Sequence, residues 1–358
     1  MKLLDLYIFR KFITTYCFAV GILVLVVCVI DYSEKTDDFI KHNLSFWQVF
    51  SEYYINFILY IVNLITPLIA FIATVFVTSK LAGHTEIIAI LSGGISLKRI
   101  LWPYFLGALL LAGITFFLNG WVMPKSNKEK AQFEINYTRS KFYFDARHVH
   151  FKLDSGLYAY MQSYNNLNAT GYQFTLEKFK QKQLIEKLSA DLIVWDSTTY
   201  RWKIERYKIH YFDNETERIS SGTNMDTLLA ITPNDFESKH LHQETLTLPQ
   251  IDMYIREQLA RGMSNLGIYY VEKYQRYLSP FAIIILTMMG VVVSAQKSRQ
   301  GTSVQIAIGF ALAFVFLILV IIGRSMGQAD SLHPAFAVGG PSVLFAIIAF
   351  VLYLRAPK

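Results

Sequence analysis

The stretch FITTYCFAVGILVLVVCVI at residues 12–30 contains no charged side chain. A helix of this length, rising about 1.5 Å per residue, crosses a bilayer hydrocarbon core of about 30 Å. Lys2, Arg10 and Lys11 before it also fit the start of a secretory signal. The stretch is longer than the apolar part of such a signal, and the residues that follow, DYSE at 31–34, are no small-residue cleavage site. We therefore predict an uncleaved membrane-spanning helix.

Five further stretches share this character. They lie at residues 55–77, 100–122, 278–295, 304–323 and 336–354. With 53% hydrophobic and 17% charged residues, the chain is too apolar for an ordinary soluble protein. The sequence predicts an α-helical membrane protein with six transmembrane helices, three at each end, and an inserted domain between them.

The basic residues of the short loops predict the orientation. With the N-terminus inside the cell, ten Lys and Arg residues fall on the cytoplasmic side, and these are Lys2, Arg10, Lys11, Lys80, Lys98, Arg99, Lys297, Arg299, Arg355 and Lys358. The other side carries only Lys35, Lys41 and Arg324. Because cytoplasmic loops are enriched in Lys and Arg, we expect both termini in the cytoplasm and the insert outside. This bias accounts for much of the net charge of +7, so no nucleic acid is expected as a partner.

The insert, from about residue 124 to 248, has the pattern of an all-β domain. Short segments rich in β-branched and aromatic residues lie at 149–153, 157–162, 172–179, 189–195, 200–212 and 226–231. Turn signals such as Asp154-Ser155-Gly156 separate them. This spacing fits a sandwich, a jelly roll or a curved open sheet, and we expect a jelly-roll-like domain.

Two features of the insert bear on function and on its connection to the membrane. In the segment at 200–212 the alternation changes phase near Glu205-Arg206, which predicts a bulge. Trp202 and Ile204 share an apolar face, which either is the domain core or lines a groove for an acyl chain. Pro249 suits an early helical position, so a polar helix over 249–277 is expected to lead into the membrane helices of residues 278–358.

Residues that carry catalysis or hold a metal are not recognisable. The chain has no phosphate-binding loop, no H-E-x-x-H motif, no nucleophile elbow and no Cys/His cluster with zinc spacing. His148 with His150, and His240 with His242, have no further ligands nearby, so a solvated or core role is favoured over a metal site. We expect no enzyme activity, no metal and no cofactor.

The loop between the second and third predicted helices is SKLAGHTEIIAILSGGIS, residues 79–96. Thr85 can cap a short helix and Gly93-Gly94 can end it. Its apolar side consists of Ile87, Ile88, Ile90 and Leu91. Such a helix either offers a surface to a cytoplasmic partner or only anchors the loop at the membrane.

The second predicted helix also carries polar groups. Asn56, Asn63 and Thr66 lie in an apolar environment, where they are expected to bond a neighbouring helix or, less favoured, to line a cavity. Pro67 predicts a kink.

Several segments of the chain resemble a known protein family. The segment TEIIAILSGGIS at 85–96, the Leu248-Pro249-Gln250 approach, the Tyr277-Leu278-Ser279-Pro280 start of the fourth span, and Pro334 and Pro341 are similar to the LptF/LptG permeases of the lipopolysaccharide-export ABC transporter. The similarity extends over the whole chain in order: three helices, a periplasmic β domain and three helices.

The resemblance implies partners and a route. Two such permeases would pair in the inner membrane over a dimer of a separate ATPase, extract lipopolysaccharide from the outer leaflet, and pass it through β domains to a periplasmic bridge protein. The loop helix near 84–94 would be the coupling helix. Glu86 would then sit in the ATPase groove, with Ile87, Ile88, Ile90, Leu91 and Gly93 as the packing surface.

An anionic glycolipid substrate makes basic residues at the outer rim the natural lipid contacts. Lys35, Lys41 and Arg324 are the candidates, although Asp31 is spaced to pair with Lys35 on one helix face. Alternatively, these side chains only extend to the interface, as cations near helix ends commonly do.

Two other functions are alternatives. One is a secondary transporter, but no span has an Asp, Glu, Lys or Arg near its centre. The other is a membrane sensor or assembly factor whose β domain binds a ligand. Neither alternative has a role for a partner ATPase.

Overall fold

The computed structural model of the chain describes residues 3–138, 148–181, 183–213, 216–236, 242–260, 266–295 and 302–355. These residues fall into two compact units, one helical and drawn from both ends of the chain, the other a β sheet from the middle. Five residues of the sequence interpretation lie outside the described ranges, namely Lys2, His240, Lys297, Arg299 and Lys358.

The described chain has six helical stretches long and apolar enough to cross a membrane, which confirms the prediction. The first three are α1 (Leu3–Lys41), α3 (Ile55–Gly83) and α5 (Leu97–Phe117). The last three are α9 (Gly267–Ser294), α10 (Thr302–Gln328) and α11 (Pro334–Arg355). Before α3 the helix includes α2 (Phe46–Gln48) and the π-helical turn η1 (Val49–Tyr54). The short helix α4 (Glu86–Ser92) connects α3 to α5.

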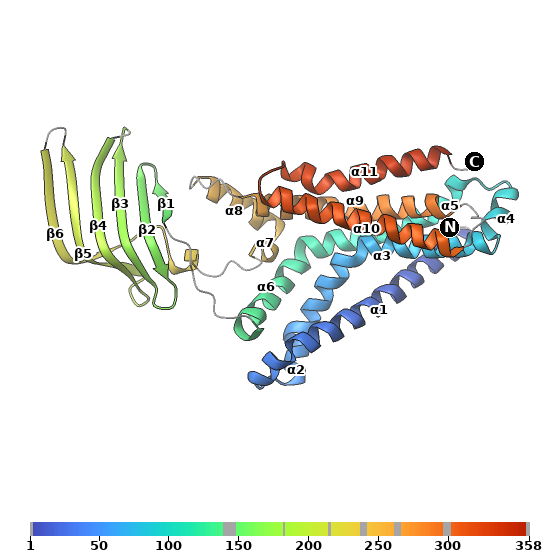
Figure 1. Ribbon diagram of the computed structural model, residues 1–358, viewed down its shortest axis with the longest axis horizontal. Helices are drawn as coiled ribbons and strands as arrows, with labels where there is room; N and C mark the ends of the chain where they lie inside the picture. The colour runs from blue at the N-terminus through green and yellow to red at the C-terminus, as the bar shows by residue number, and fades with distance from the viewer. Residues whose placement is uncertain are drawn as a thin grey trace. The chain divides into compact units, whose positions relative to one another are not determined.

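The helical unit is built around α3 and α9, which lie side by side (Figure 1). One apolar cluster joins α3 and α9 to α1, α4 and α5, and a second joins them to α10 and α11. At Gly323 of α10 an added Cβ would collide with the carbonyl oxygen of Ala337 in α11. Small residues allow such close approach of membrane helices. Pro67, for which the sequence predicts a kink, lies inside α3.

Two boundaries differ from the sequence expectation. The third span was expected to end near residue 122, but helical structure continues through η2 (Leu118–Val122), α6 (Met123–Phe133) and η3 (Glu134–Thr138). Pro124 lies where η2 passes into α6, within this continuous helical stretch. The single polar helix expected over 249–277 is instead α8 (Leu248–Ala260) and the first turns of α9, preceded by α7 (His242–Thr245).

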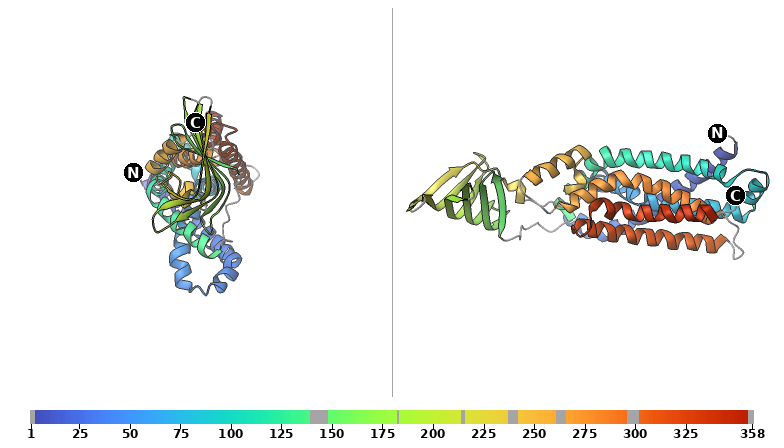
Figure 2. Two further views of the ribbon diagram at one scale, coloured as in Figure 1. Left: turned by 90° about the vertical axis from the view of Figure 1, so that its left-hand side faces the viewer. Right: turned by 90° about the horizontal axis from the view of Figure 1, so that it is seen from above.

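The insert forms one antiparallel sheet of six strands in sequence order. The strands are β1 (Val149–Asp154), β2 (Leu157–Asn165), β3 (Thr170–Lys180), β4 (Gln183–Asp196), β5 (Arg201–Asp213) and β6 (Thr216–Thr227). This confirms an inserted β domain. Among the three architectures left open by the strand spacing, the described strands form the curved open sheet, because each hairpin sets a strand beside its predecessor (Figure 2). The segment predicted as a strand at 226–231 mostly follows β6.

The phase change predicted near Glu205-Arg206 is present, but not as a bulge. Arg206 has a left-handed φ of 48°. The pairing of β4 with β5 keeps one register across it, so no residue is inserted. In β5 the buried side chains change from Trp202 and Ile204 to the partly buried Tyr207 and Ile209. The neighbouring strand changes at the opposite position, Asp191, whose carboxylate lies 3.6 Å from Arg206 Nε.

The apolar face of the sheet is covered by the chain that returns from β6. Leu229, Ile231 and Phe236, the last in the 3-10 turn η4 (Pro233–Phe236), pack on it. The indole of Trp202 donates to the carbonyl oxygen of Ile231 at 2.8 Å. Trp202 and Ile204 are both 0% exposed, so in this structure they belong to the core of the β unit.

Candidate functional site

The helix α4 presents two different sides. Ile87 is only 1% exposed and packs with the core of α1, α3 and α5, and Ile90 and Leu91 pack partly against it. Ile88 is 42% exposed, and Gly93 is exposed at the C-terminal end. Thr85 has a left-handed φ of 63° and makes no side-chain cap, in contrast to the expectation. Of the five residues proposed as a packing surface, Ile88 and Gly93 are thus the ones open to a partner.

Glu86 is held by the N-terminal turns of α1. Its carboxylate accepts a hydrogen bond from the Tyr7 hydroxyl at 3.0 Å and lies 3.8 Å from the Lys11 ammonium. Lys11 also bonds Tyr7. The carboxylate remains about one-third exposed, so it is fixed in position yet accessible.

The three cations proposed as lipid contacts have different surroundings. The Lys35 ammonium lies 2.8 Å from Asp31, 3.9 Å from Glu134 and against the Tyr53 hydroxyl, so it is engaged within the helical unit. Lys41 is exposed at the end of α1. Arg324, near the end of α10, lines a cavity.

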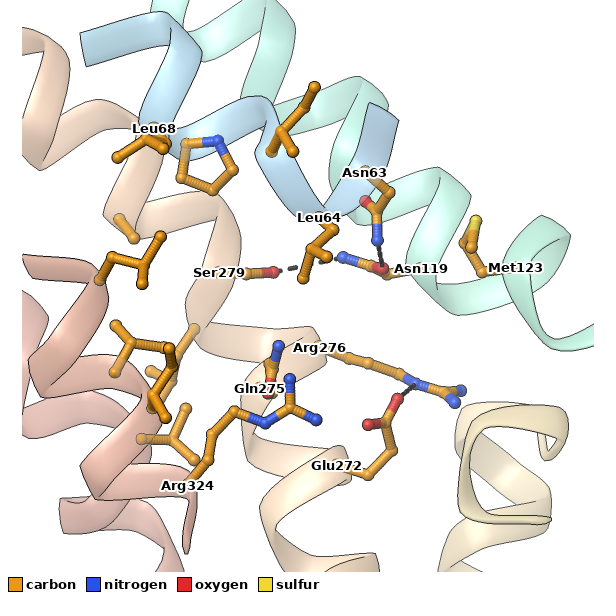
Figure 3. A pocket seen from close by; sticks show the side chains of 18 of the residues that line it. Asn63, Leu64, Leu68, Asn119, Met123, Glu272, Gln275, Arg276, Ser279 and Arg324 are labelled. Atoms are coloured by element: carbon orange, nitrogen blue, oxygen red, sulfur yellow. Dashed lines mark hydrogen bonds and ion pairs between the residues drawn. The ribbon is translucent and has the colours of Figure 1, made fainter. Parts of the chain in front are cut away.

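This cavity, of about 500 Å³, lies inside the helical unit. One part is apolar, with walls from α3, α9, α10 and α11 formed by Leu64, Ile65, Pro67, Leu68, Leu278, Ala282, Phe316, Leu317, Val320, Ile321 and Val338. The other part is polar, with Asn63, Asn119, Asn127, Glu244, Glu272, Gln275, Arg276, Ser279 and Arg324 (Figure 3). A cavity of this kind suits an amphiphilic molecule.

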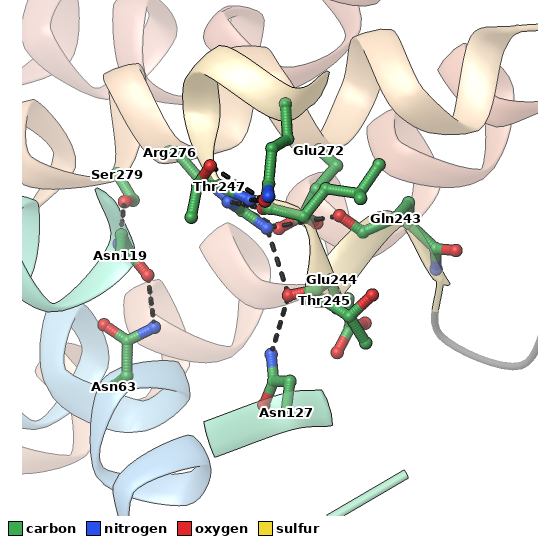
Figure 4. Close-up of polar contacts among 12 residues, drawn as sticks. Asn63, Asn119, Asn127, Gln243, Glu244, Thr245, Thr247, Glu272, Arg276 and Ser279 are labelled. Carbon is green, nitrogen blue, oxygen red and sulfur yellow. Dashed lines mark hydrogen bonds and ion pairs between the residues drawn. The ribbon is translucent and has the colours of Figure 1, made fainter. Parts of the chain in front are cut away.

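The guanidinium of Arg276 is bonded to several groups within the protein. Its guanidinium pairs with Glu272 at 2.8 Å and donates to the carbonyl oxygens of Leu246 at 2.5 Å and of Gln243 and Glu244 at 3.2 Å each (Figure 4). The residue is 3% exposed. Gln243 and Glu244 belong to α7 and Leu246 follows it, so Arg276 binds carbonyls that have no donor left within the short helix and fixes α7 to α9.

Asparagine side chains connect the helices around the cavity. Asn63 of α3 donates to Asn119 at 2.6 Å, and Asn119 donates to Ser279 of α9 at 3.2 Å. Asn127 of α6 donates to the Glu244 carbonyl at 3.4 Å. The interhelical bonding predicted for Asn63 is therefore present, and Asn63 lines the cavity as well.

Glu244 is a buried carboxyl group, 8% exposed, in the polar part of the cavity. Burial raises its pKa to about 7, and the nearby Glu272 adds to the increase, whereas Lys130, Arg324 and Arg276 oppose it. Its Oε2 has no hydrogen-bond partner among the described residues. The group therefore gains a proton on folding between its ordinary pKa of 4.5 and about 7.

This proton uptake predicts a pH dependence of stability. A raised pKa contributes stability that is complete below pH 4.5 and is lost as the pH rises through about 7. In detergent without added lipid, Glu244→Gln should therefore be more stable than the wild type at pH 8, by at most about 3 kcal/mol of unfolding free energy, and equally stable at pH 4. Thermal melts across this range test it. Glu52→Gln, at an exposed position, should not separate from the wild type at high pH in this way, and equal pH profiles for Glu244→Gln and the wild type would contradict the prediction.

Sequence reasoning missed most of this site. Asn119 lies within an apolar stretch and was readable as a polar group in a membrane helix, as Asn63 was. Glu244 and Arg276 are separated by 32 residues, and nothing in the sequence indicates that they meet.

Comparison with known proteins gave one family. The profile described as "Lipopolysaccharide export system permease LptF/LptG" matches residues 6–355. A search of individually curated protein sequences gave no match.

Proposed function

The chain belongs to the LptF/LptG family of lipopolysaccharide export permeases, and from this premise we propose that it is one of two paired permease subunits. In this proposal the pair takes lipopolysaccharide from the outer leaflet of the inner membrane, and a separate ATPase dimer supplies the energy. The lipid then passes to a periplasmic bridge protein. The observation that carries the proposal is the family match over nearly the whole chain.

The ATPase would bind at α4. Two observations support this: Glu86 is fixed by Tyr7 and Lys11 yet accessible, and Ile88 presents an apolar side chain beside it. The excess of Lys and Arg in the loops of the same side is consistent with a cytoplasmic location of α4. The sequence has no phosphate-binding loop of its own, which is consistent with nucleotide binding by another chain.

Lipopolysaccharide would first meet the outer end of α1. Lys41 is exposed there and is the cation best exposed to bind a phosphate. Lys35 would take part only after leaving Asp31 and Glu134. In the β domain, an acyl chain would reach Trp202 and Ile204 only after the segment with Leu229 and Ile231 moves away from the sheet.

A photocrosslinking experiment tests the route. Photoreactive residues at position 41 and at position 204 are compared in membrane vesicles with and without ATP. We expect lipopolysaccharide to crosslink at position 41 in both conditions and at position 204 only with ATP. A probe at Tyr200, a highly exposed position at the start of β5, serves as the control for random encounters. Crosslinks at 204 that need no ATP, or none at 41, would contradict the proposed route.

A further inference from the structure

The polar part of the cavity contains buried oxygen atoms that accept no hydrogen bond from the described residues. Asn63 Oδ1, Asn127 Oδ1, Gln275 Oε1 and Glu244 Oε2 are buried and have no hydrogen-bond partner among the described residues. All four residues line the cavity. Asn127 is 4% exposed and Glu244 8%, so solvent at the protein surface does not reach them. Unmet buried acceptors are costly, at about 1 to 3 kcal/mol each, and call for an explanation.

The orientation of two of these groups is set by their own bonds. The amide nitrogen of Asn63 donates to Asn119 Oδ1, and that of Asn127 donates to the carbonyl of Glu244. Each nitrogen therefore uses one of its two N–H groups within the protein, and each oxygen is left to accept a bond from a ligand. The cavity thus requires hydrogen-bond donors from its occupant.

Arg324, by contrast, requires an anionic group from the occupant of the cavity. Its side chain reaches into the cavity toward Gln275 (Figure 3), and no hydrogen bond or ion pair of its guanidinium is found in the described part of the chain. Arg276 on the neighbouring helix is, by contrast, saturated by Glu272 and three carbonyls. A half-buried guanidinium without a hydrogen bond or ion pair among the described residues favours a phosphate.

The apolar part is accessible from the membrane side of the helices. Leu64 of α3 is 50% exposed, Ile321 of α10 is 57% exposed, and both line the cavity. These helices are neighbours. A chain passing between their outward side chains would meet Phe316 and Leu68 inside. Water alone would leave this apolar part unfilled, because ordered water needs several polar partners.

We propose that this cavity binds an aminophospholipid, with its phosphate on Arg324, its ammonium group donating to Glu244 and to two of the three amide oxygens, and one acyl chain along the apolar wall. The ligand is a resident membrane lipid rather than the exported glycolipid, so the inference goes beyond the proposed function. A trimethylated head group has no N–H to donate and a glycerol head group has no ammonium, which is why neither satisfies the site. In its ionised form, the Glu244 carboxylate is also matched by an ammonium and by no part of a purely anionic lipid.

Native mass spectrometry of the full-length purified chain tests this inference. The delipidated protein receives phosphatidylethanolamine, phosphatidylcholine, phosphatidylglycerol or lipid A at equal concentration. We expect phosphatidylethanolamine adducts to exceed those of phosphatidylcholine about tenfold, the value of one strong hydrogen bond of about 1.4 kcal/mol. Arg324→Gln and Glu244→Gln should each remove that preference.

Matched variants separate binding from folding. Arg324→Lys keeps the cation and should keep most of the adduct, and Lys80→Gln, an exposed cation on α3 outside the cavity, should change nothing. The proposal would be overturned if phosphatidylcholine were retained as well as phosphatidylethanolamine, or if neither Gln variant changed the adducts. The absence of any adduct would also overturn it, and so would lipid A displacing phosphatidylethanolamine, which would make the cavity a cargo site. None of these results bears on the α4 contact or the crosslinks at position 41.

Discussion

Reversing the charge at Glu86 should abolish both lipopolysaccharide export and co-purification of the ATPase. The change places a guanidinium where the partner is proposed to receive a carboxylate, and an uncompensated charge that becomes buried in such a contact costs about 3 to 5 kcal/mol. It also sets a cation beside Lys11, now 3.8 Å from the carboxylate. Affinity purification of the Glu86→Arg chain, followed by detection of the bound ATPase, measures the first effect. An export assay in cells depleted of the wild-type chain measures the second.

Two controls separate partner contact from local packing. Tyr7→Phe and Lys11→Gln each remove an internal bond of Glu86 but keep its charge, so both variants should retain the ATPase. Ile88→Ala should weaken association without lowering stability, because the side chain is exposed, whereas Ile87→Ala should lower stability by about 2 to 5 kcal/mol. Full association and export in Glu86→Arg would refute the coupling role, and would reopen the transporter and sensor alternatives.

Removing the guanidinium of Arg276 should have the largest effect on stability. Arg276→Ala breaks the pair with Glu272 and frees three carbonyl oxygens at the end of α7. Breaking a buried pair from one side costs about 3 to 5 kcal/mol, because the remaining charge stays buried. Thermal melts and limited proteolysis measure the result, and we expect new cleavage between residues 242 and 248, where α7 loses its attachment.

The same helix provides a matched comparison. Lys273, three residues before Arg276, pairs with Asp252 of α8 at 2.5 Å, but both side chains are partly exposed. Lys273→Ala should therefore cost less than about 1 kcal/mol. Arg276→Lys should lose an intermediate amount of stability, because an ammonium can pair with Glu272 but cannot donate to three separate carbonyl oxygens as a guanidinium does. Equal losses in Arg276→Ala and Lys273→Ala would show that Arg276 does not hold α7.

The elements that were predictable are those whose signal is local. Six uncharged stretches identify the spans because bilayer thickness alone sets their length. Five of the strands could be predicted from the alternation of apolar and polar residues and from the turn residues between them, but β6 could not. Its sequence TERISSGTNMDT is almost entirely polar, as an edge strand with little buried surface allows, so the strand was sought in the apolar residues that follow it.

The cavity was not predictable for a different reason. Arg276 and Arg324 have the same chemistry and both lie near helix ends, so sequence reasoning had no ground to treat one as a clamp and the other as a binding group. The distinction depends on α7, whose four residues bring carbonyls to Arg276 and none to Arg324. Likewise, the spacing of Lys35 from Asp31 could be read from the sequence, whereas its contacts with Tyr53 and Glu134 could not.

The proline inside α3 has a mechanical consequence. Pro67 has no N–H, so the carbonyl of Asn63, four residues earlier, receives no bond from the helix. This missing bond lies where the Asn63 side chain faces the cavity, while the C-terminal end of the same helix leads to α4 through Gly83. α3 therefore lacks one backbone hydrogen bond beside the cavity, and bending at this point breaks one hydrogen bond fewer than bending elsewhere in the helix. If the proposed ATPase contact at α4 displaces that end of α3, we expect the helix to change its angle next to the cavity.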